Sequence, residues 1–137
     1  MQGIVVLTGV TGKSGQYAIE RLIERKEECR NLRFRAIARS KEKAAFLEQS
    51  GLPLDVCVGD VDDDAFLLSV FTGADTLLHI VGIHTSLHVI PLAIQAGIKR
   101  IFTVHTTGIY SKYKSASAEY NQIDAEISRL CAEANVS

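Results

Sequence analysis

The sequence predicts an α/β fold, a doubly wound parallel sheet of about five strands with helices on both faces. Short apolar runs, rich in β-branched residues, alternate five times with segments whose apolar residues recur at helical spacing. Turn and cap residues separate the segments, and no repeat or low-complexity tract interrupts the series. Right-handed crossovers between parallel strands distribute the helices over both faces of one sheet. One domain over residues 1–137 is expected.

The strands are expected at the short aliphatic runs. Residues 4–7 form the unbroken run that a strand buried on both faces of a parallel sheet requires. Residues 32–38 are apolar at alternate positions, and residues 74–82 are again aliphatic on both faces. The expected strands cover residues 4–7, 32–38, 54–58, 74–82 and 98–108.

The expected helices carry residues typical of helix ends. Ser40 is a suitable N-cap for the second helix, which Gly51 and Pro53 end. The acidic residues 62–64 place carboxylates at the positive end of the third helix. A polar segment, residues 110–117, is expected between the last strand and the last helix. The expected helices cover residues 16–25, 41–49, 62–70, 86–96 and 118–134.

A glycine-rich turn, TGVTGKSG at residues 8–15, joins the first strand to the first helix. Gly9, Gly12 and Gly15 allow a sharp turn, close approach of a pyrophosphate and close packing of the helix on the strand. The free N–H groups at the helix start then face the phosphates. We interpret the segment as a dinucleotide loop. The residues expected to bind the cofactor here are Gly9, Thr11, Gly12, Lys13, Ser14 and Gly15.

The segment is compatible with two other interpretations. A tight turn without any ligand uses the same glycines for packing alone. A mononucleotide P-loop is suggested by the Gly-Lys-Ser sequence, but that motif needs a glycine five positions before its Gly-Lys pair, where this chain has Leu7.

The residue after the second strand predicts which dinucleotide binds. A carboxylate at that strand end would favour NAD by accepting hydrogen bonds from the ribose, but this chain has Arg39. A guanidinium suits the 2′-phosphate of NADP(H), with help from Ser40 or Lys41 and with Lys41 or Lys43 able to compensate for its loss. We therefore expect NADP(H) rather than NAD(H); a solvated surface arginine is the alternative.

Parallel strands place a ligand crevice at their carboxyl ends, so the residues just after the third and fourth strands are further candidates. Asp60 is expected either to meet the adenine amine or to cap the following helix. The additional residues expected to line the cofactor site are Asp60, Val61, Val81 and Gly82.

These motifs, in order, resemble the atypical short-chain dehydrogenase/reductases. They are TGVTGKSG, Ala-Arg-Ser at residues 38–40, Gly-Asp at residues 59–60 and Ala-Gly-Ile-Lys-Arg-Ile-Phe at residues 96–102. The chain is most similar to the NmrA-like, NAD(P)H-binding group, which includes quinone reductases. The resemblance implies a Rossmann-type domain. Members run to about twice this length, which implies that the chain is the cofactor-binding half, truncated before a C-terminal substrate region with a sixth strand.

The resemblance also implies a catalytic hydroxyl, then a tyrosine with a lysine four residues later. Thr106 or Thr107 stands where the hydroxyl is expected. The segment from Tyr110 to Lys114 has the required spacing but directly follows the strand. Tyr120 has the better helical placement, although Asp124 stands where the lysine is expected. Thr106 and Tyr120 are the catalytic candidates.

Three functions are compatible with these features. The first is an oxidoreductase that uses NADPH to reduce a small carbonyl or quinone acceptor. The second is a non-catalytic regulatory protein that senses the dinucleotide. The third, a sugar-nucleotide epimerase, is weaker because Tyr120 lacks its lysine.

Composition narrows the partners. Lys and Arg number 15 against 16 Asp and Glu, so no basic field favours nucleic acid or an anionic membrane. Neither a signal peptide nor an apolar run of membrane-spanning length is recognisable, which favours the cytoplasm. His84 and His88 stand four residues apart without a third ligand, and no metal site is expected. The expected partners are the dinucleotide, an unknown small substrate and a second copy of the chain through an exposed sheet edge.

Overall fold

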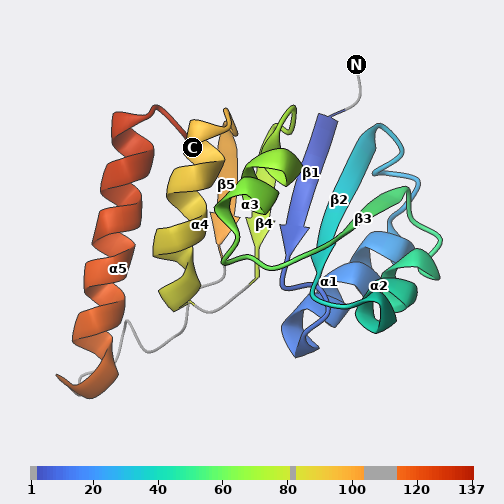
Figure 1. Ribbon diagram of the computed structural model, residues 1–137, viewed down its shortest axis with the longest axis horizontal. Helices are drawn as coiled ribbons and strands as arrows, with labels where there is room; N and C mark the ends of the chain where they lie inside the picture. The colour runs from blue at the N-terminus through green and yellow to red at the C-terminus, as the bar shows by residue number, and fades with distance from the viewer. Residues whose placement is uncertain (1–2, 81–82, 104–113) are drawn as a thin grey trace.

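The computed structural model describes residues 3–80, 83–103 and 114–137 and shows the predicted alternation of strands and helices (Figure 1). The N-terminal half contains β1 (Gly3–Thr8), α1 (Lys13–Glu24), β2 (Leu32–Ala38), α2 (Lys41–Glu48) and β3 (Leu54–Val58). The C-terminal half contains α3 (Asp64–Phe71), β4 (Thr76–His79), α4 (Ile83–Gln95), β5 (Arg100–Thr103) and α5 (Lys114–Glu133).

All strand pairs in the sheet are parallel, and the strand order is β3-β2-β1-β4-β5. Val6 of β1 lies between Arg35 of β2 and Leu77 of β4. The chain winds outward from β1 in both directions, so the order reverses between β1 and β4. A crevice at the carboxyl ends of these two strands is the ligand position in such sheets. The predicted doubly wound α/β fold is confirmed.

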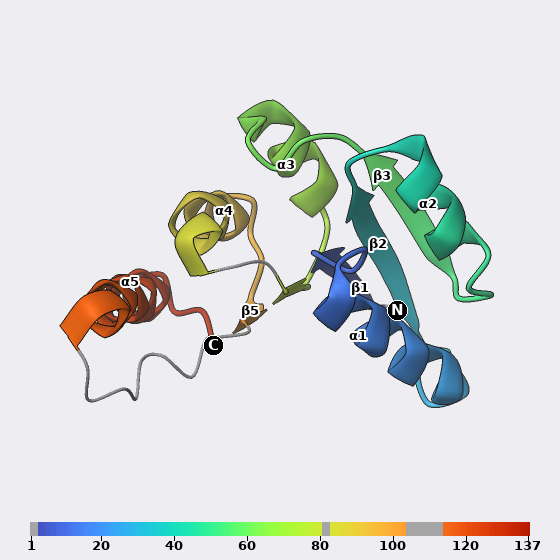
Figure 2. The same ribbon diagram turned by 90° about the horizontal axis from the view of Figure 1, so that it is seen from below.

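Helices cover both faces of the sheet, with α1 on one side and α3 and α4 on the other (Figure 2). Ile19 of α1 and Leu47 of α2 belong to one buried cluster with Phe34 of β2. On the opposite face, α3 and α4 pack on the sheet, and α5 packs on α4. This second layer is built around Phe71, Leu77, Val89, Ile90, Ile123 and Ile127.

Three helices begin earlier than predicted. Helix α1 starts at Lys13, so Gly15 is helical rather than part of the turn. Helix α4 starts at Ile83 instead of residue 86. Helix α5 starts at Lys114 and takes in part of the expected polar segment, because residues 114–117 contain no glycine or proline that would stop a helix.

Strand β4 is shorter than the apolar run that predicted it. It pairs with β1 only as far as Thr8, which lies opposite His79. Beyond that pair, β1 turns away at Gly9, and β4 has no neighbour on that side with which to continue the ladder. Residues 104–108 of the expected fifth strand lie outside the described residues.

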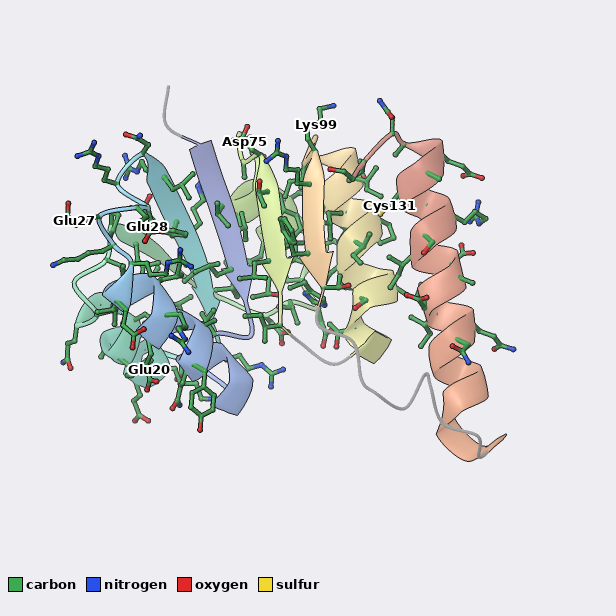
Figure 3. All side chains as sticks on the ribbon, turned by 180° about the vertical axis from the view of Figure 1, so that it is seen from behind. Glu20, Glu27, Glu28, Asp75, Lys99 and Cys131 are labelled. Atoms are coloured by element: carbon green, nitrogen blue, oxygen red, sulfur yellow. The ribbon has the colours of Figure 1, made fainter. Side chains whose placement is uncertain are left out.

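The β5 edge is paired at its start by the end of the chain. The Ile101 N–H donates to the Ser137 carbonyl at 2.8 Å, and the Ser137 N–H donates to the Lys99 carbonyl at 3.1 Å. This is the hydrogen-bond pattern of a parallel neighbour. On the α1 side of the sheet, no described helix lies in front of β4 and β5, and Phe102 is 57% exposed (Figure 3).

At the end of the sheet where the strands begin, Asp75 connects β1 to the segment before β5 (Figure 3). Its carboxylate accepts a hydrogen bond from the Ile4 N–H at 2.9 Å, and its carbonyl accepts from the Lys99 N–H.

Within the described ranges, no helix combines the length and apolar character needed to cross a membrane.

Candidate functional site

The three glycines of the loop after β1 have different structural roles. Gly9 has a φ of +75°, which favours glycine, and its carbonyl accepts a hydrogen bond from the Gly12 N–H at 3.2 Å. A Cβ on Gly15 would lie 2.1 Å from the Gly9 carbonyl oxygen and 2.3 Å from the Val10 Cα. A Cβ on Gly12 would meet the Gly9 oxygen at an ordinary 3.5 Å. The fold therefore requires glycine at positions 9 and 15 but tolerates a side chain at position 12.

The start of α1 has no side-chain cap. Gly12 is its N-cap residue, and no acidic residue stands in the first turn. By contrast, the Ser40 hydroxyl accepts from the Lys43 N–H at the start of α2, and the Asp63 carboxylate accepts from the Phe66 N–H at the start of α3. The positive end of α1 is therefore left for an anion from outside the helix.

A cavity of about 320 Å³ opens at the carboxyl ends of β1, β2 and β4. Four parts of the chain meet there: the glycine loop, the end of β2 with the residues that follow it, the residues that follow β3, and the residue that follows β4. Of the predicted cofactor residues, Gly9, Thr11, Gly12, Arg39 and Val61 line this one space. Its full lining consists of Gly9, Thr11, Gly12, Ile37, Arg39, Lys43, Val61 and Ile80.

Arg39 differs from the two arginines of β2 in its interactions. Arg33 of β2 pairs with Asp55 at 3.1 Å, and Arg35 donates to the carbonyls of Val70 and Thr72 at the end of α3. The Arg39 guanidinium has no hydrogen bond or ion pair within the described part of the chain. Lys43 adds a second positive charge to the same wall. The cavity therefore combines an open helix start with two cations.

Asp60 adjoins this cavity but is partly engaged in its own turn. It lines a neighbouring cavity of about 330 Å³ together with Arg39, Gly59 and Asp62. The Asp60 carboxylate accepts from the Asp62 N–H at 2.9 Å, and the N-cap of α3 is Asp63. The suggestion that Asp60 caps the helix is therefore wrong. Its place beside Arg39 leaves it a candidate for the adenosine end of a ligand.

Beneath the glycine loop, Thr8 and His79 form a buried polar pair. The Thr8 Oγ1 lies 2.7 Å from the His79 Nδ1, and both residues are fully buried. Burial lowers the pKa of His79 to about 4, so the imidazole is neutral near pH 7. Next to the pair, the Ile80 N–H donates to the Thr8 carbonyl at 3.1 Å. The loop after β1 and the chain after β4 are thus joined at the cavity floor.

Several predicted site residues cannot be placed around the cavity. Val81, Gly82 and Thr106 lie outside the described residues. The backbones of Lys13, Ser14 and Tyr120 belong to α1 and α5, but their side chains lie outside the described part of the structure.

Sequence reasoning did not name Ile37 or Ile80 as lining residues, and it gave Lys43 only a compensating role. Ile37 and Ile80 stand within apolar runs of the sequence, so neither carries a distinguishing signal. Lys43 was detectable by its position one helical turn after Ser40.

The histidine pair does not form a described metal centre. His88 of α4 reaches across to α3, where its Nε2 lies 3.0 Å from the Asp64 carboxylate. The side chain of His84 lies outside the described part. Among the residues that the structure describes, no group of three His, Cys, Asp or Glu side chains is arranged to hold a metal ion.

Together these features define a class of protein. A parallel 3-2-1-4-5 sheet, with a glycine turn into an uncapped helix at the switch point, is the architecture of dinucleotide-binding domains. The chain matches the profile of the NAD(P)H-binding family over residues 9–134, and it belongs to this family. A comparison with curated proteins gave no match.

Solved structures with this fold include NAD(P)-dependent reductases of the NmrA-like, atypical short-chain dehydrogenase/reductase type, so the resemblance predicted from sequence is confirmed. Triphenylmethane reductase from Citrobacter sp., complexed with NADP(H), is 24% identical with a TM-score of 0.72; the match covers 96% of this chain and 46% of that one. An NADPH-dependent quinone oxidoreductase from Escherichia coli, complexed with NADPH, is 26% identical with a TM-score of 0.73, at 96% and 46% coverage. The chain thus spans less than half the length of these reductases.

Proposed function

We propose that this NAD(P)H-binding domain prefers NADPH and belongs to an oxidoreductase that reduces a small carbonyl or quinone acceptor. The observation that carries the cofactor preference is Arg39, which is exposed, has no partner within the described residues and lines the same cavity as Gly9 and Gly12. Lys43 stands on the same wall. Two cations suit a 2′-phosphate, whereas an unphosphorylated ribose offers them no charge to neutralise.

Each part of the cavity has a role in holding the cofactor. The N–H groups at the start of α1 bind the pyrophosphate, and Arg39 with Lys43 binds the 2′-phosphate. Ile37 and Val61 supply apolar walls that keep water from the cofactor. The cofactor supplies the hydride when bound. Thr106 and Tyr120 remain predicted proton donors to the acceptor.

We propose that this chain contributes only the predicted proton donors Thr106 and Tyr120 to the acceptor site, and that the rest of that site lies outside the chain. The chain corresponds to less than half of the reductases it is similar to, and its own cavity is accounted for by the dinucleotide. Residues 1–137 are therefore proposed to be the NAD(P)-binding half of a longer cytoplasmic protein. Association of two copies through the β5 edge is a further prediction, which light scattering tests.

Titration of NADPH and NADH against the parent chain and an Arg39→Asp variant tests the cofactor preference. A charge-assisted hydrogen bond contributes roughly 1.5–3 kcal/mol, so the parent should prefer NADPH by about ten- to a hundredfold. The variant should lose that preference. Arg33→Gln is the matched control, because it removes an arginine of β2 that does not line this cavity and should leave the preference unchanged. Retention of the parent's preference by Arg39→Asp would contradict the proposal.

Oxidation of NADPH in the presence of a quinone panel separates an enzyme from a sensor. The 137-residue chain should bind NADPH but turn over slowly, because we propose that most of the region that excludes water and positions the acceptor lies outside it. Steady turnover by a longer gene product supports the oxidoreductase. Tight binding by that product without oxidation supports the regulatory protein instead.

A further inference from the structure

A row of polar residues crosses one face of the sheet at the floor of the cofactor cavity. Thr8, His79 and Thr103 are neighbours in register on β1, β4 and β5, and each is the last residue of its strand. They lie on the face that α3 and α4 cover. The other residues of these three strands on that face are Ile4, Val6, Leu77 and Ile101.

The central pair of this row is buried and hydrogen-bonded. The Thr8 Oγ1 lies 2.7 Å from the His79 Nδ1, both side chains are fully buried, and the His79 Nε2 has no partner within the described residues. An apolar pair of similar shape would fill the same space without an unpaired nitrogen. Unlike apolar packing, the hydrogen bond is directional, so it fixes the separation and orientation of the ends of β1 and β4.

The residues that directly follow Thr8 and His79 line the proposed cofactor cavity. Gly9, where the loop turns with a φ of +75°, directly follows Thr8. Ile80, which lines the cavity, directly follows His79, and its N–H donates to the Thr8 carbonyl. One side-chain and one main-chain hydrogen bond thus hold the glycine loop against the end of β4.

We propose that His79 is a positioning residue that, through Thr8, holds the glycine loop in the geometry needed to bind the pyrophosphate. This inference rests on the proposed binding of NADPH in the cavity. Arg39, directly after β2, and Lys43 of α2 form the proposed 2′-phosphate subsite. Neither residue has a described hydrogen bond to Thr8 or His79. Loss of the pair should therefore weaken ligands that contain a pyrophosphate and spare those that contain only the 2′-phosphate.

The test uses two ligands, NADPH and adenosine 2′-monophosphate, with four variants. Thr8→Val and His79→Leu each remove one partner, the double variant removes both, and His79→Asn keeps an amide where Nδ1 stands. Calorimetry measures both affinities, and urea denaturation measures stability for every variant.

The single variants Thr8→Val and His79→Leu should bind NADPH about tenfold more weakly and adenosine 2′-monophosphate within about twofold of the parent. The double variant should recover stability, because neither partner is left alone, but should not recover NADPH affinity. His79→Asn should recover part of the NADPH affinity, since its amide can bond to the Thr8 hydroxyl.

Two results would overturn the inference: equal loss of affinity for both ligands, or a double variant that recovers NADPH affinity along with stability. If Thr8→Val does not fold, the comparison of His79→Leu with His79→Asn decides the question in the same way. A parent chain that fails to bind NADPH would overturn the proposed function itself, and is distinguishable because no variant is needed to see it.

Discussion

Helices α1 and α3 both begin at the carboxyl end of the sheet, but their N-termini are capped differently. Asp63 caps α3, and Asp64 adds a negative charge in the first turn. Helix α1 has Gly12 as its N-cap residue, so it has no side-chain cap, and its first turn contains no acidic residue. A helix start that satisfies its own N–H groups needs no external partner, whereas one left open beside a cavity is able to accept an anion.

Arg35 of β2 and Arg39, which follows β2, differ in the same way: one is engaged within the fold and the other is not. Arg35 donates to two carbonyls at the end of α3 and thereby holds that helix to the sheet. Arg39, four residues later, lines the cavity without a described partner. The fold therefore uses the first arginine for packing, and we propose that the second binds a ligand.

The largest expected effect distinguishes the glycines that the fold needs from the one that the ligand needs. Gly15→Val places a Cβ about 2.1 Å from the Gly9 carbonyl oxygen and should destabilise the chain by more than about 3 kcal/mol. Urea denaturation measures this. Gly12→Ala is the matched control and should cost no more than about 1 kcal/mol. A Gly15→Val variant as stable as the parent would contradict the packing described here.

Acid should destabilise the folded chain through His79. Its pKa falls from 6.5 to about 4 on burial, so between these pH values the unfolded chain binds a proton that the folded chain does not. Stability therefore falls as pH drops from about 6.5 to 4, by up to about 3 kcal/mol from this group. Comparing urea denaturation of the parent and His79→Asn across this range isolates the contribution. Identical slopes in the two proteins would show that His79 is not buried as described.

Removing the cap of α3 should have the smallest effect. Asp63→Ala frees the Phe66 N–H and should cost about 1 kcal/mol of stability. NADPH affinity should stay unchanged, because Asp63 does not line the cavity. Thermal denaturation and calorimetry together check both expectations. A large loss of affinity would show that the two helix starts are not functionally distinct.

Local patterns predicted most of the fold. The bounds of β2 and β3 agree with those predicted, because polar and turn residues flank both runs. The end of β4 was misplaced because an apolar run does not reveal where its neighbour stops, and β1 stops at Thr8. That limit depends on the register between strands far apart in sequence.

Part of the candidate site was likewise predictable from local sequence patterns, and part was not. Gly9, Gly12 and Arg39 were predicted because each follows a strand in a recognisable local pattern. The contact between Thr8 and His79 was not, since it joins residues 71 positions apart, and a histidine within an aliphatic run carries no local signal. Local chemistry therefore identified residues that line the candidate cavity, while the contact that joins the two strand ends beneath it required the three-dimensional register.

Calorimetric titration of NADPH into the parent and a Gly12→Val variant tests the central claim most directly. Position 12 has room for a Cβ within the protein, so the variant should fold, and its side chain should block the start of α1. Circular dichroism and denaturation confirm folding, and Asp63→Ala serves as the helix-start control. We expect the parent and Asp63→Ala to bind NADPH and folded Gly12→Val to lose detectable binding. Unchanged affinity in folded Gly12→Val would contradict the account and make the glycine loop a structural turn only.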